Sequence, residues 1–156
     1  MDVVGVVAGV DEGFDGFFAA AEPSLRRALV ARYGFDRGRE ATAEALAWGF
    51  EHWDRLQDME NPTGYLYRVG CSRTRGRRRR VLFEAPPAPG EPAVEPELAA
   101  ALTRLSANQR SAVVLVKGYG WELHEVAELT GSSISTVNTH VRRGLAKLRI
   151  ELGVEP

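Results

Sequence analysis

A helix-turn-helix pattern over residues 120–150 constrains this chain more than any other part of its sequence. The segment predicts a short helix, a tight turn at Gly131 and a longer helix that ends in basic residues. Two helices joined by a short turn containing glycine form the motif whose second helix can enter the major groove of DNA. An ordinary helical hairpin with a solvated polar face is the alternative interpretation of the same pattern.

The second helix of the pattern has two chemically distinct faces. At 100° per residue, its aliphatic side chains fall on one narrow stripe that must be buried: Ile134, Val137, Val141, Leu145 and Leu148. Small hydroxyl residues let a helix lie deep in the groove, and arginine can pair with a guanine edge or a phosphate. We therefore predict DNA contacts from Ser135, Thr136, Asn138, Thr139, Arg142, Arg143 and Lys147. Ser133 is the predicted N-cap, and Gly144 predicts close backbone packing inside the helix.

The net charge of −1 over 156 residues hides a concentrated basic block. Residues 62–83 hold seven arginines and no acid, whereas residues 1–61 carry a net charge of −6. Residues 84–97 hold four glutamates and no base, and residues 98–156 carry a net charge of +2. A basic block in a near-neutral chain favours a local contact with a polyanion, and a solvated, arginine-rich helix end is the alternative.

The chain carries one cysteine, Cys71, so no internal disulfide can form and a reducing compartment is expected. Residues 3–10 lack the basic start of a signal peptide, and no apolar stretch approaches the ~20 residues of a membrane span. These features predict a cytoplasmic protein. An enzyme using Cys71 with His52, His124 or His140 as a base is an alternative, but no histidine neighbours Cys71 in the sequence. Dispersed histidines and scattered glycines predict no metal site and no cofactor.

A proline-rich linker divides the chain. Residues 81–97 contain five prolines together with acids and a glycine, which excludes a packed helix or strand. At ~3.1 Å per residue this segment can reach roughly 50 Å. It predicts an all-α protein of two small helical domains, residues 11–80 and 98–153.

Helical periodicity and capping residues predict the elements of both domains. The Ser106–Gln109 capping box begins one helix, and Asn61-Pro62 begins another. Besides the two helices of the helix-turn-helix, we expect helices over residues 15–32, 41–56, 61–80, 97–105 and 106–117.

The predicted helix over residues 41–56 carries a tryptophan away from its expected core face. That core face is predicted to contain Ala43, Leu46, Phe50, Trp53 and Leu56. Trp48 lies on the other side beside Glu44, Ala47 and Glu51. Trp48 is therefore either an exposed contact for a protein partner or a residue that the following helix covers.

The segment from Tyr65 to Arg80 mixes aromatic residues with arginines and gives a second, less specific nucleic-acid signal. Aromatic rings can stack on unpaired bases, and arginines neutralise phosphates. Core packing is the favoured interpretation for Tyr65 itself.

Taken together, these residues resemble the bacterial RNA polymerase sigma factors of the sigma-70 family, in the small two-domain extracytoplasmic-function type. The resemblance runs from about Phe14 to Leu152 and is strongest in the C-terminal half. It is carried there by Leu102, Leu105, Gln109-Arg110, Val113-Val114-Leu115, Gly120, Glu125-Val126-Ala127, Thr136-Val137, Arg143-Gly144-Leu145 and Leu148-Arg149.

The resemblance implies a transcription initiation factor that directs core RNA polymerase to promoters. The C-terminal module would read the −35 element, and the N-terminal module would bind polymerase and the −10 element. The implied polymerase contacts are Glu44, Ala47, Trp48 and Glu51. The implied −10 contacts are Tyr67, Arg68, Ser72, Arg73, Arg75, Arg77 and Arg78. Promoter DNA and core polymerase are the implied partners, and an anti-sigma factor is a further partner that the family suggests.

The chain departs from the family pattern at five positions. Glu44 and Ala47 stand where the family usually has Asp and Gln, Tyr65 and Ser72 where it has Trp and Asn, and Glu122 where it has a hydroxyl cap. Two other functions therefore stay open. One is a stand-alone helix-turn-helix regulator that binds operator duplex without polymerase; the other is a polymerase-binding regulator that does not melt promoters.

Overall fold

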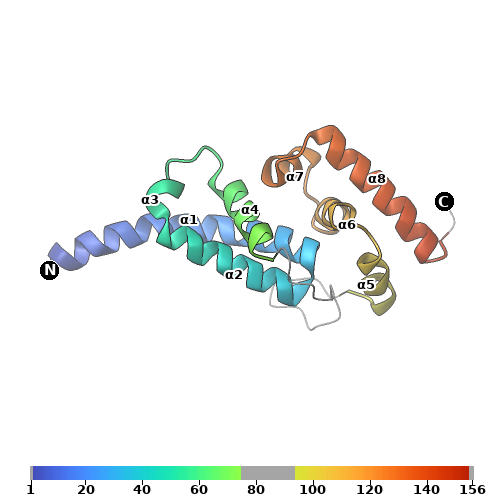
Figure 1. The fold of residues 1–156 in the computed structure, drawn as a ribbon, viewed down its shortest axis with the longest axis horizontal. Coiled ribbons are helices and arrows are strands. Elements are labelled where there is room, and N and C mark those ends of the chain that lie inside the picture. Colours follow the sequence, from blue (N-terminus) through green and yellow to red (C-terminus); the bar gives the residue numbers. More distant parts are fainter. Residues whose placement is uncertain (1, 75–93, 155–156) are drawn as a thin grey trace.

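The computed structural model describes residues 2–74 and 94–154, leaving aside the side chains of residues 2–12, and every regular element in it is helical (Figure 1). This confirms the all-α prediction. The N-terminal half comprises α1 (Asp2–Tyr33), α2 (Phe35–Glu51), α3 (Trp53–Leu56) and α4 (Pro62–Thr74). The C-terminal half comprises α5 (Pro96–Thr103), α6 (Ala107–Val113), the π-helical turn η1 (Val114–Gly118), α7 (Leu123–Thr130) and α8 (Ile134–Glu151).

The first two helices form a tight pair. Gly34 ends α1 with a φ of 88°, a left-handed conformation that favours glycine. Further along, Gly38 lies so close to α1 that a Cβ there would come within 2.4 Å of the Cα of Val30. These two glycines let the chain reverse within one residue and pack α2 along α1.

The second helix ends earlier than its periodicity predicts. It runs from Phe35 to Glu51 and stops at His52, whose backbone leaves the helical region and whose Nδ1 lies 2.9 Å from the carbonyl oxygen of Trp48. The predicted core face over residues 41–56 is also wrong in part, because the buried side of α2 runs through Ala41, Ala45 and Gly49. Phe50 is 58% exposed and Ala43 is exposed, whereas Leu46 and Leu56 are buried as expected.

The third predicted helix begins where its capping residues indicate. The backbone N–H of Gly64 donates to Asn61 Oδ1 at 3.1 Å, and α4 follows from Pro62. Gly70 packs against α1, where a Cβ would meet Leu29 Cδ1 at 2.9 Å. Arg75 and the rest of the predicted helix to Arg80, like most of the predicted linker, lie outside the described residues.

Local capping in the C-terminal half follows the sequence. The Ser106–Gln109 capping box is present, with the Gln109 N–H donating to Ser106 Oγ at 3.1 Å and the Ser106 N–H donating to Gln109 Oε1 at 3.3 Å. Glu122, in place of the usual hydroxyl cap, takes part in a similar arrangement, since its N–H donates to Glu125 Oε1 at 3.0 Å. The predicted close packing at Gly144 is confirmed, because a Cβ there would lie 2.5 Å from Val113 Cγ2.

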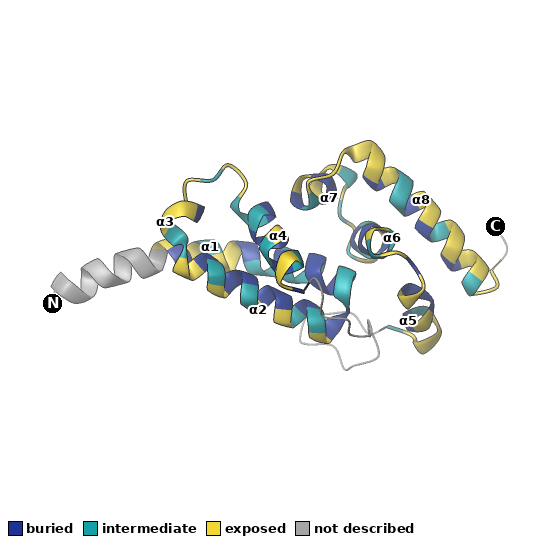
Figure 2. Cartoon of the chain, in the orientation of Figure 1, coloured by how far each residue is buried: buried dark blue, intermediate teal, exposed yellow. Residues whose placement is uncertain are grey.

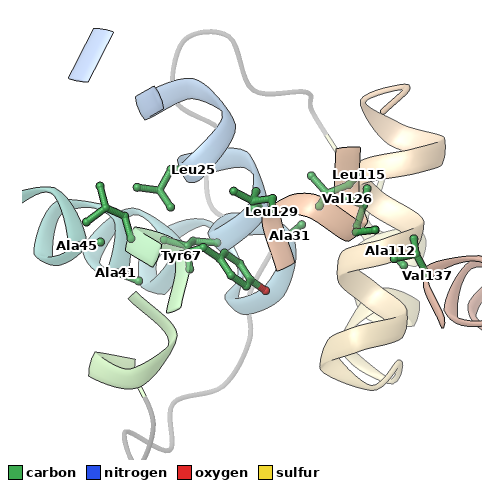
Figure 3. Packing of buried hydrophobic residues seen from close by; sticks show 14 of the residues in the cluster. Leu25, Ala31, Ala41, Ala45, Tyr67, Ala112, Leu115, Val126, Leu129 and Val137 are labelled. Carbon is green, nitrogen blue, oxygen red and sulfur yellow. The ribbon is translucent and has the colours of Figure 1, made fainter. Parts of the chain in front are cut away.

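The two halves pack directly against each other. Helix α6 and η1 lie against α1, and α7 lies against α4 (Figure 1). One buried hydrophobic cluster runs from Ala41 and Ala45 of α2, through Tyr67 and Leu129, to Leu115 and Val137 (Figure 3). We refer to this packing of the N-terminal half on the C-terminal half as the docked arrangement.

Candidate nucleic-acid interface

Helix α8 presents the polar face that its sequence predicts. Ser135, Thr136 and Asn138 are exposed in its first turns, and Arg142, Arg143 and Lys147 are exposed further along (Figure 2). Thr139 is half-buried, and its Oγ1 donates to the carbonyl oxygen of Ser135 at 3.1 Å. The face contains no acidic side chain, so its positive charge is available to a phosphate backbone.

The opposite side of α8 is the aliphatic ridge that anchors it. Val137, Val141 and Leu148 are buried, and Leu145 is half-buried. Ile134 departs from the prediction, because it is 52% exposed at the first position of the helix, where the turn holds it beyond the hydrophobic core. The ridge packs α8 against α6 and α7, and this packing leaves the polar face outward.

The turn between α7 and α8 has the geometry of a helix-turn-helix. Gly131 ends α7 with a φ of 74°, and its N–H and that of Ser132 both donate to the carbonyl oxygen of Ala127 at 3.0 Å. Ser133 then caps α8, accepting the Thr136 N–H at 3.0 Å. The predicted cap and turn are therefore confirmed, and together they define the angle at which α8 leaves α7.

The second candidate surface lies on α4. Arg68, Ser72 and Arg73 are exposed there, but Tyr67 is only 5% exposed. Tyr67 is a predicted DNA contact, but in the docked arrangement its ring belongs to the hydrophobic core (Figure 3). Burial, with Cys71 beside it, raises the pKa of the Tyr67 hydroxyl, which stays protonated. The predicted contacts Arg75, Arg77 and Arg78 lie outside the described residues.

A pocket of about 360 Å³ opens beside α4 and is lined by both aromatic and basic side chains. Trp48 and Tyr65 line it, with ring centroids 5.3 Å apart, and the Trp48 ring stacks on His52 at 4.2 Å. Arg68 and Arg73 line the same pocket. We call it the Trp48 pocket. Trp48 is half-buried with its ring against Tyr65 of α4, so the following helix covers it in part and leaves the rest of the ring facing the pocket.

The four predicted polymerase contacts all lie on α2. Ala47 and Glu51 are exposed, and Glu44 and Trp48 are half-buried. Next to them lies an apolar groove of about 560 Å³ that includes Phe18, 41% exposed, and Phe50, 58% exposed. Helical periodicity alone missed this groove, because it placed Phe50 in the core; the run Phe14–Phe18 on α1 is the signal that could have suggested it.

Helix α8 is anchored by its aliphatic ridge, follows a capped turn and turns a basic face outward. These features define the chain as a helix-turn-helix DNA-binding protein. Residues 96–148 match the family model for sigma-70, region 4. The chain is 29% identical over 150 residues to the ECF RNA polymerase sigma factor EcfG of Rhodopseudomonas palustris, covering 87% of this chain and 83% of that protein. It is 34% identical over 119 residues to the RNA polymerase sigma-E factor of Streptomyces coelicolor, covering 69% of this chain and 67% of that one.

Among solved structures, the sigma factor RpoE of Bartonella quintana, in a complex with the anti-sigma factor NepR, superimposes with a TM-score of 0.67. The match covers 93% of this chain and 99% of the RpoE chain at 21% sequence identity, and it supports the fold described above. The chain belongs to the sigma-70 family of RNA polymerase sigma factors, in the extracytoplasmic-function type. It is a sequence-specific DNA-binding transcription initiation factor that directs core RNA polymerase to promoters.

None of the helices in the described part of the chain is both long and apolar enough to span a bilayer. Nor do the described residues bring together three or more side chains of the kinds that hold a metal ion.

Proposed function

We propose that α8 reads the −35 element in the major groove and that α4 and the Trp48 pocket bind the opened −10 element. The observation that carries the first part is the division of α8 into a buried ridge and an exposed face of hydroxyls, an amide and cations. Bidentate arginine contacts at Arg142 and Arg143 would supply base choice, and Lys147 would add phosphate affinity.

The chemistry of the Trp48 pocket supports the second part. An unpaired base has an apolar face that can stack on an aromatic ring, and its phosphate needs a cation nearby. Trp48 and Tyr65 provide rings, and Arg68 and Arg73 provide cations within the same pocket. Capture of one base there would offset the few kcal/mol that unstacking costs. Tyr65 would then stack on the unpaired base in place of the Trp that the family usually has at this position.

The apolar groove beside α2 supports a polymerase contact larger than the four residues predicted. Ala47 and Phe50 line the groove together with Phe18 from α1, and Glu51 is exposed next to Phe50. Exposed aromatic side chains rimmed by charge are typical of protein–protein contacts. We propose that the groove and the acidic edge of α2 dock on core polymerase.

The docked arrangement cannot hold both promoter elements at once. By their positions the two elements lie about 25 base pairs apart, or about 85 Å along the duplex at ~3.4 Å per base pair. In the docked arrangement α4 contacts α7, and α8, with 18 residues, is only about 27 Å long. We therefore propose that the halves separate on polymerase. Residues 11–80 and 98–153 would then act as two domains on a linker over residues 81–97.

Two further assignments follow from the family. We propose that the protein acts in the cytoplasm, where it meets polymerase and DNA, and as a binding factor rather than an enzyme. The solved relative RpoE was captured with the anti-sigma factor NepR, which supports an anti-sigma partner for this chain also.

Reconstituted transcription tests the proposal. Core polymerase plus this protein is incubated with a library of duplex promoters, and the transcripts are sequenced. We expect initiation only from templates that share two motifs at a constant spacing. Tight binding of a single operator by the protein alone, with no initiation on any template, would instead support the stand-alone regulator.

A further inference from the structure

A cavity of about 440 Å³ lies between the two halves of the molecule. Arg68 and Ser72 of α4 line it on one side, and Ser111 of α6 and His140 of α8 on the other. Because both halves contribute walls, the cavity exists only in the docked arrangement. We call it the interface cavity. Its volume falls in the range of small-molecule sites.

The lining of the interface cavity is basic and rich in hydroxyl groups. Arg32 and Arg68 contribute guanidinium groups, and no aspartate or glutamate is among the described residues that line it. Ser72, Thr130 and Ser132 contribute hydroxyls. A concave wall with two cations, several hydroxyl donors and no carboxylate favours an oxyanion over a neutral or cationic ligand.

Ser111 gives an independent indication of a ligand. Its residue is only 4% exposed, and its Oγ makes no hydrogen bond to any described residue. A buried hydroxyl without a partner is unfavourable, and such a group calls for an explanation. An oxyanion in the interface cavity would accept a hydrogen bond from the Ser111 hydroxyl.

The guanidinium of Arg32, which also lines the interface cavity, is held in place by a hydrogen bond. The Nη1 of Arg32 donates to Asn108 Oδ1 at 3.0 Å, so its guanidinium is fixed at the cavity wall by an amide rather than neutralised by an acid. Arg68 lies against the turn of the helix-turn-helix, with its Nη2 3.9 Å from where a Cβ of Gly131 would be. One cation therefore comes from α1 and the other from α4, and both line the same cavity as Ser111.

We propose that the interface cavity binds a phosphorylated small molecule of about the size of a nucleoside monophosphate, with its phosphate held by Arg32, Arg68 and the Ser111 hydroxyl. A phosphate of single-stranded DNA has the same chemistry. The small molecule is favoured because the cavity requires the docked arrangement, whereas promoter binding requires its opening. A ligand of the docked arrangement stabilises it by a free energy that grows with the logarithm of ligand concentration above Kd, and so opposes promoter binding. This regulatory consequence rests on the proposed function, but binding itself does not.

Calorimetric titration of the full chain tests the site, with inorganic phosphate, pyrophosphate, AMP and a six-nucleotide single-stranded DNA as separate probes. We expect saturable binding of AMP or pyrophosphate with one site per chain. Arg68→Gln and Ser111→Ala should each weaken it at least tenfold. Arg55→Gln, which removes an exposed arginine of α3 outside the cavity, should leave the affinity unchanged.

The Ser111→Ala variant separates a ligand role from a structural one. Because its hydroxyl has no partner, removing it should leave the melting temperature equal or higher while the affinity falls. Small-angle X-ray scattering should show a smaller radius of gyration with ligand than without. Three results would each overturn the proposal: no binding of any free phosphate at millimolar concentration, binding that neither cavity variant weakens, or binding of the oligonucleotide alone. None of these measurements contains polymerase, so their failure would leave the transcription result standing.

Discussion

The guanidinium of Arg110 donates two hydrogen bonds, at 2.6 and 3.1 Å, to the backbone carbonyl oxygen of Arg32, in the opposite half of the molecule. Arg32 lies in the last turn of α1, where the helix dipole is negative and free carbonyl groups need partners. Arg110 is 5% exposed and also donates to the carbonyl oxygen of Leu105 at 3.0 Å. One buried cation thus joins the C-terminal end of α1 to the turn that follows α5.

Replacing Arg110 should open the docked arrangement. Arg110→Met keeps much of the side-chain volume but leaves the Arg32 and Leu105 carbonyl groups without their donor. Hydrogen bonds to a charged group are worth about 1.5–3 kcal/mol, so a loss of that order is expected. Scattering should show a larger radius of gyration, and denaturant unfolding should show a lower midpoint.

The matched control for that variant is Arg110→Lys, which keeps the charge without the planar fork. It should give an intermediate loss, because an ammonium group cannot make the same two-pronged contact. A compact and equally stable Arg110→Met protein would show that hydrophobic contacts alone dock the halves.

The charge of Arg110 also sets an expectation for pH. Burial, together with the nearby Arg32 and Arg37, lowers its pKa to about 10. Because the pKa is lower in the folded than in the unfolded protein, the unfolded state binds more protons than the folded state above about pH 10. The free energy of unfolding therefore rises with pH above about pH 10, and below that pH the contribution of Arg110 does not change with pH. The unfolding free energies of wild type and Arg110→Met should differ by the same amount at pH 7 and pH 9. A difference that drifts over this interval would mean that Arg110 loses its proton earlier.

Gly144 should be intolerant of alanine even though it lies inside a helix. A Cβ there would lie 2.5 Å from Val113 Cγ2 and 3.3 Å from the Gln109 carbonyl oxygen. Overpacking of this kind typically costs 1–3 kcal/mol, which outweighs the ~1 kcal/mol gain in helix propensity. Gly16→Ala is the matched control, since nothing lies within 4 Å of its Cβ position and the same gain should appear as stabilisation. Thermal unfolding of both variants should give shifts of opposite sign; a stabilised Gly144→Ala would show that α6 and α8 can move apart freely.

Arg143→Ala should weaken recognition of the −35 element. Loss of a bidentate base contact costs about 1–3 kcal/mol and relaxes the preference at one position. Loss of a phosphate contact weakens binding to all sequences and reduces the slope of log affinity against log salt concentration by about one. Promoter-library selection with the holoenzyme, repeated at two salt concentrations, distinguishes the two effects. Lys117→Ala, an exposed cation on η1, is the control and should leave the selected motif unchanged. An unaltered library preference with Arg143→Ala would argue against placing α8 in the groove.

Variants of the Trp48 pocket and of the apolar groove should be defective at different steps of initiation. Tyr65→Ala should impair opening of the −10 element, since stacking is worth about 1–3 kcal/mol per base, while polymerase affinity is retained. Phe50→Ala should do the reverse, weakening polymerase binding without changing promoter opening once polymerase is saturating. Fluorescence of 2-aminopurine in the −10 element and a titration of labelled polymerase measure the two steps separately. Identical defects from both variants would show that the two surfaces do not act independently.

Much of the candidate site could be predicted because it depends on local periodicity and capping. The polar face of α8, the Ser133 cap and the close packing at Gly144 all follow from positions within a few residues of one another. The misplacement of Phe50 has a different cause. The buried side of α2 consists largely of small residues, among them Ala41, Ala45 and Gly49, and a helical wheel that follows the large apolar side chains does not find it.

Other features could not be predicted because they depend on segments far apart in the chain. Tyr67 carries the aromatic ring expected at a DNA contact, but the packing of α4 between the two halves places that ring in the core. Trp48 is half-buried with its ring against Tyr65, which the sequence had left as one of two alternatives.

The sequence by itself determined that this protein is all helical and that its C-terminal half carries a helix-turn-helix, because helix periodicity and capping act over a few residues. The resemblance to the sigma factors came from particular motif residues in the same sequence. Only the tertiary structure decided that the halves dock, that Arg110 joins them through the carbonyl group of Arg32, and that a basic cavity lies between them. These features require contacts between residues more than seventy positions apart, and no local pattern along the chain specifies which of many possible partners a buried arginine or an exposed ring will meet.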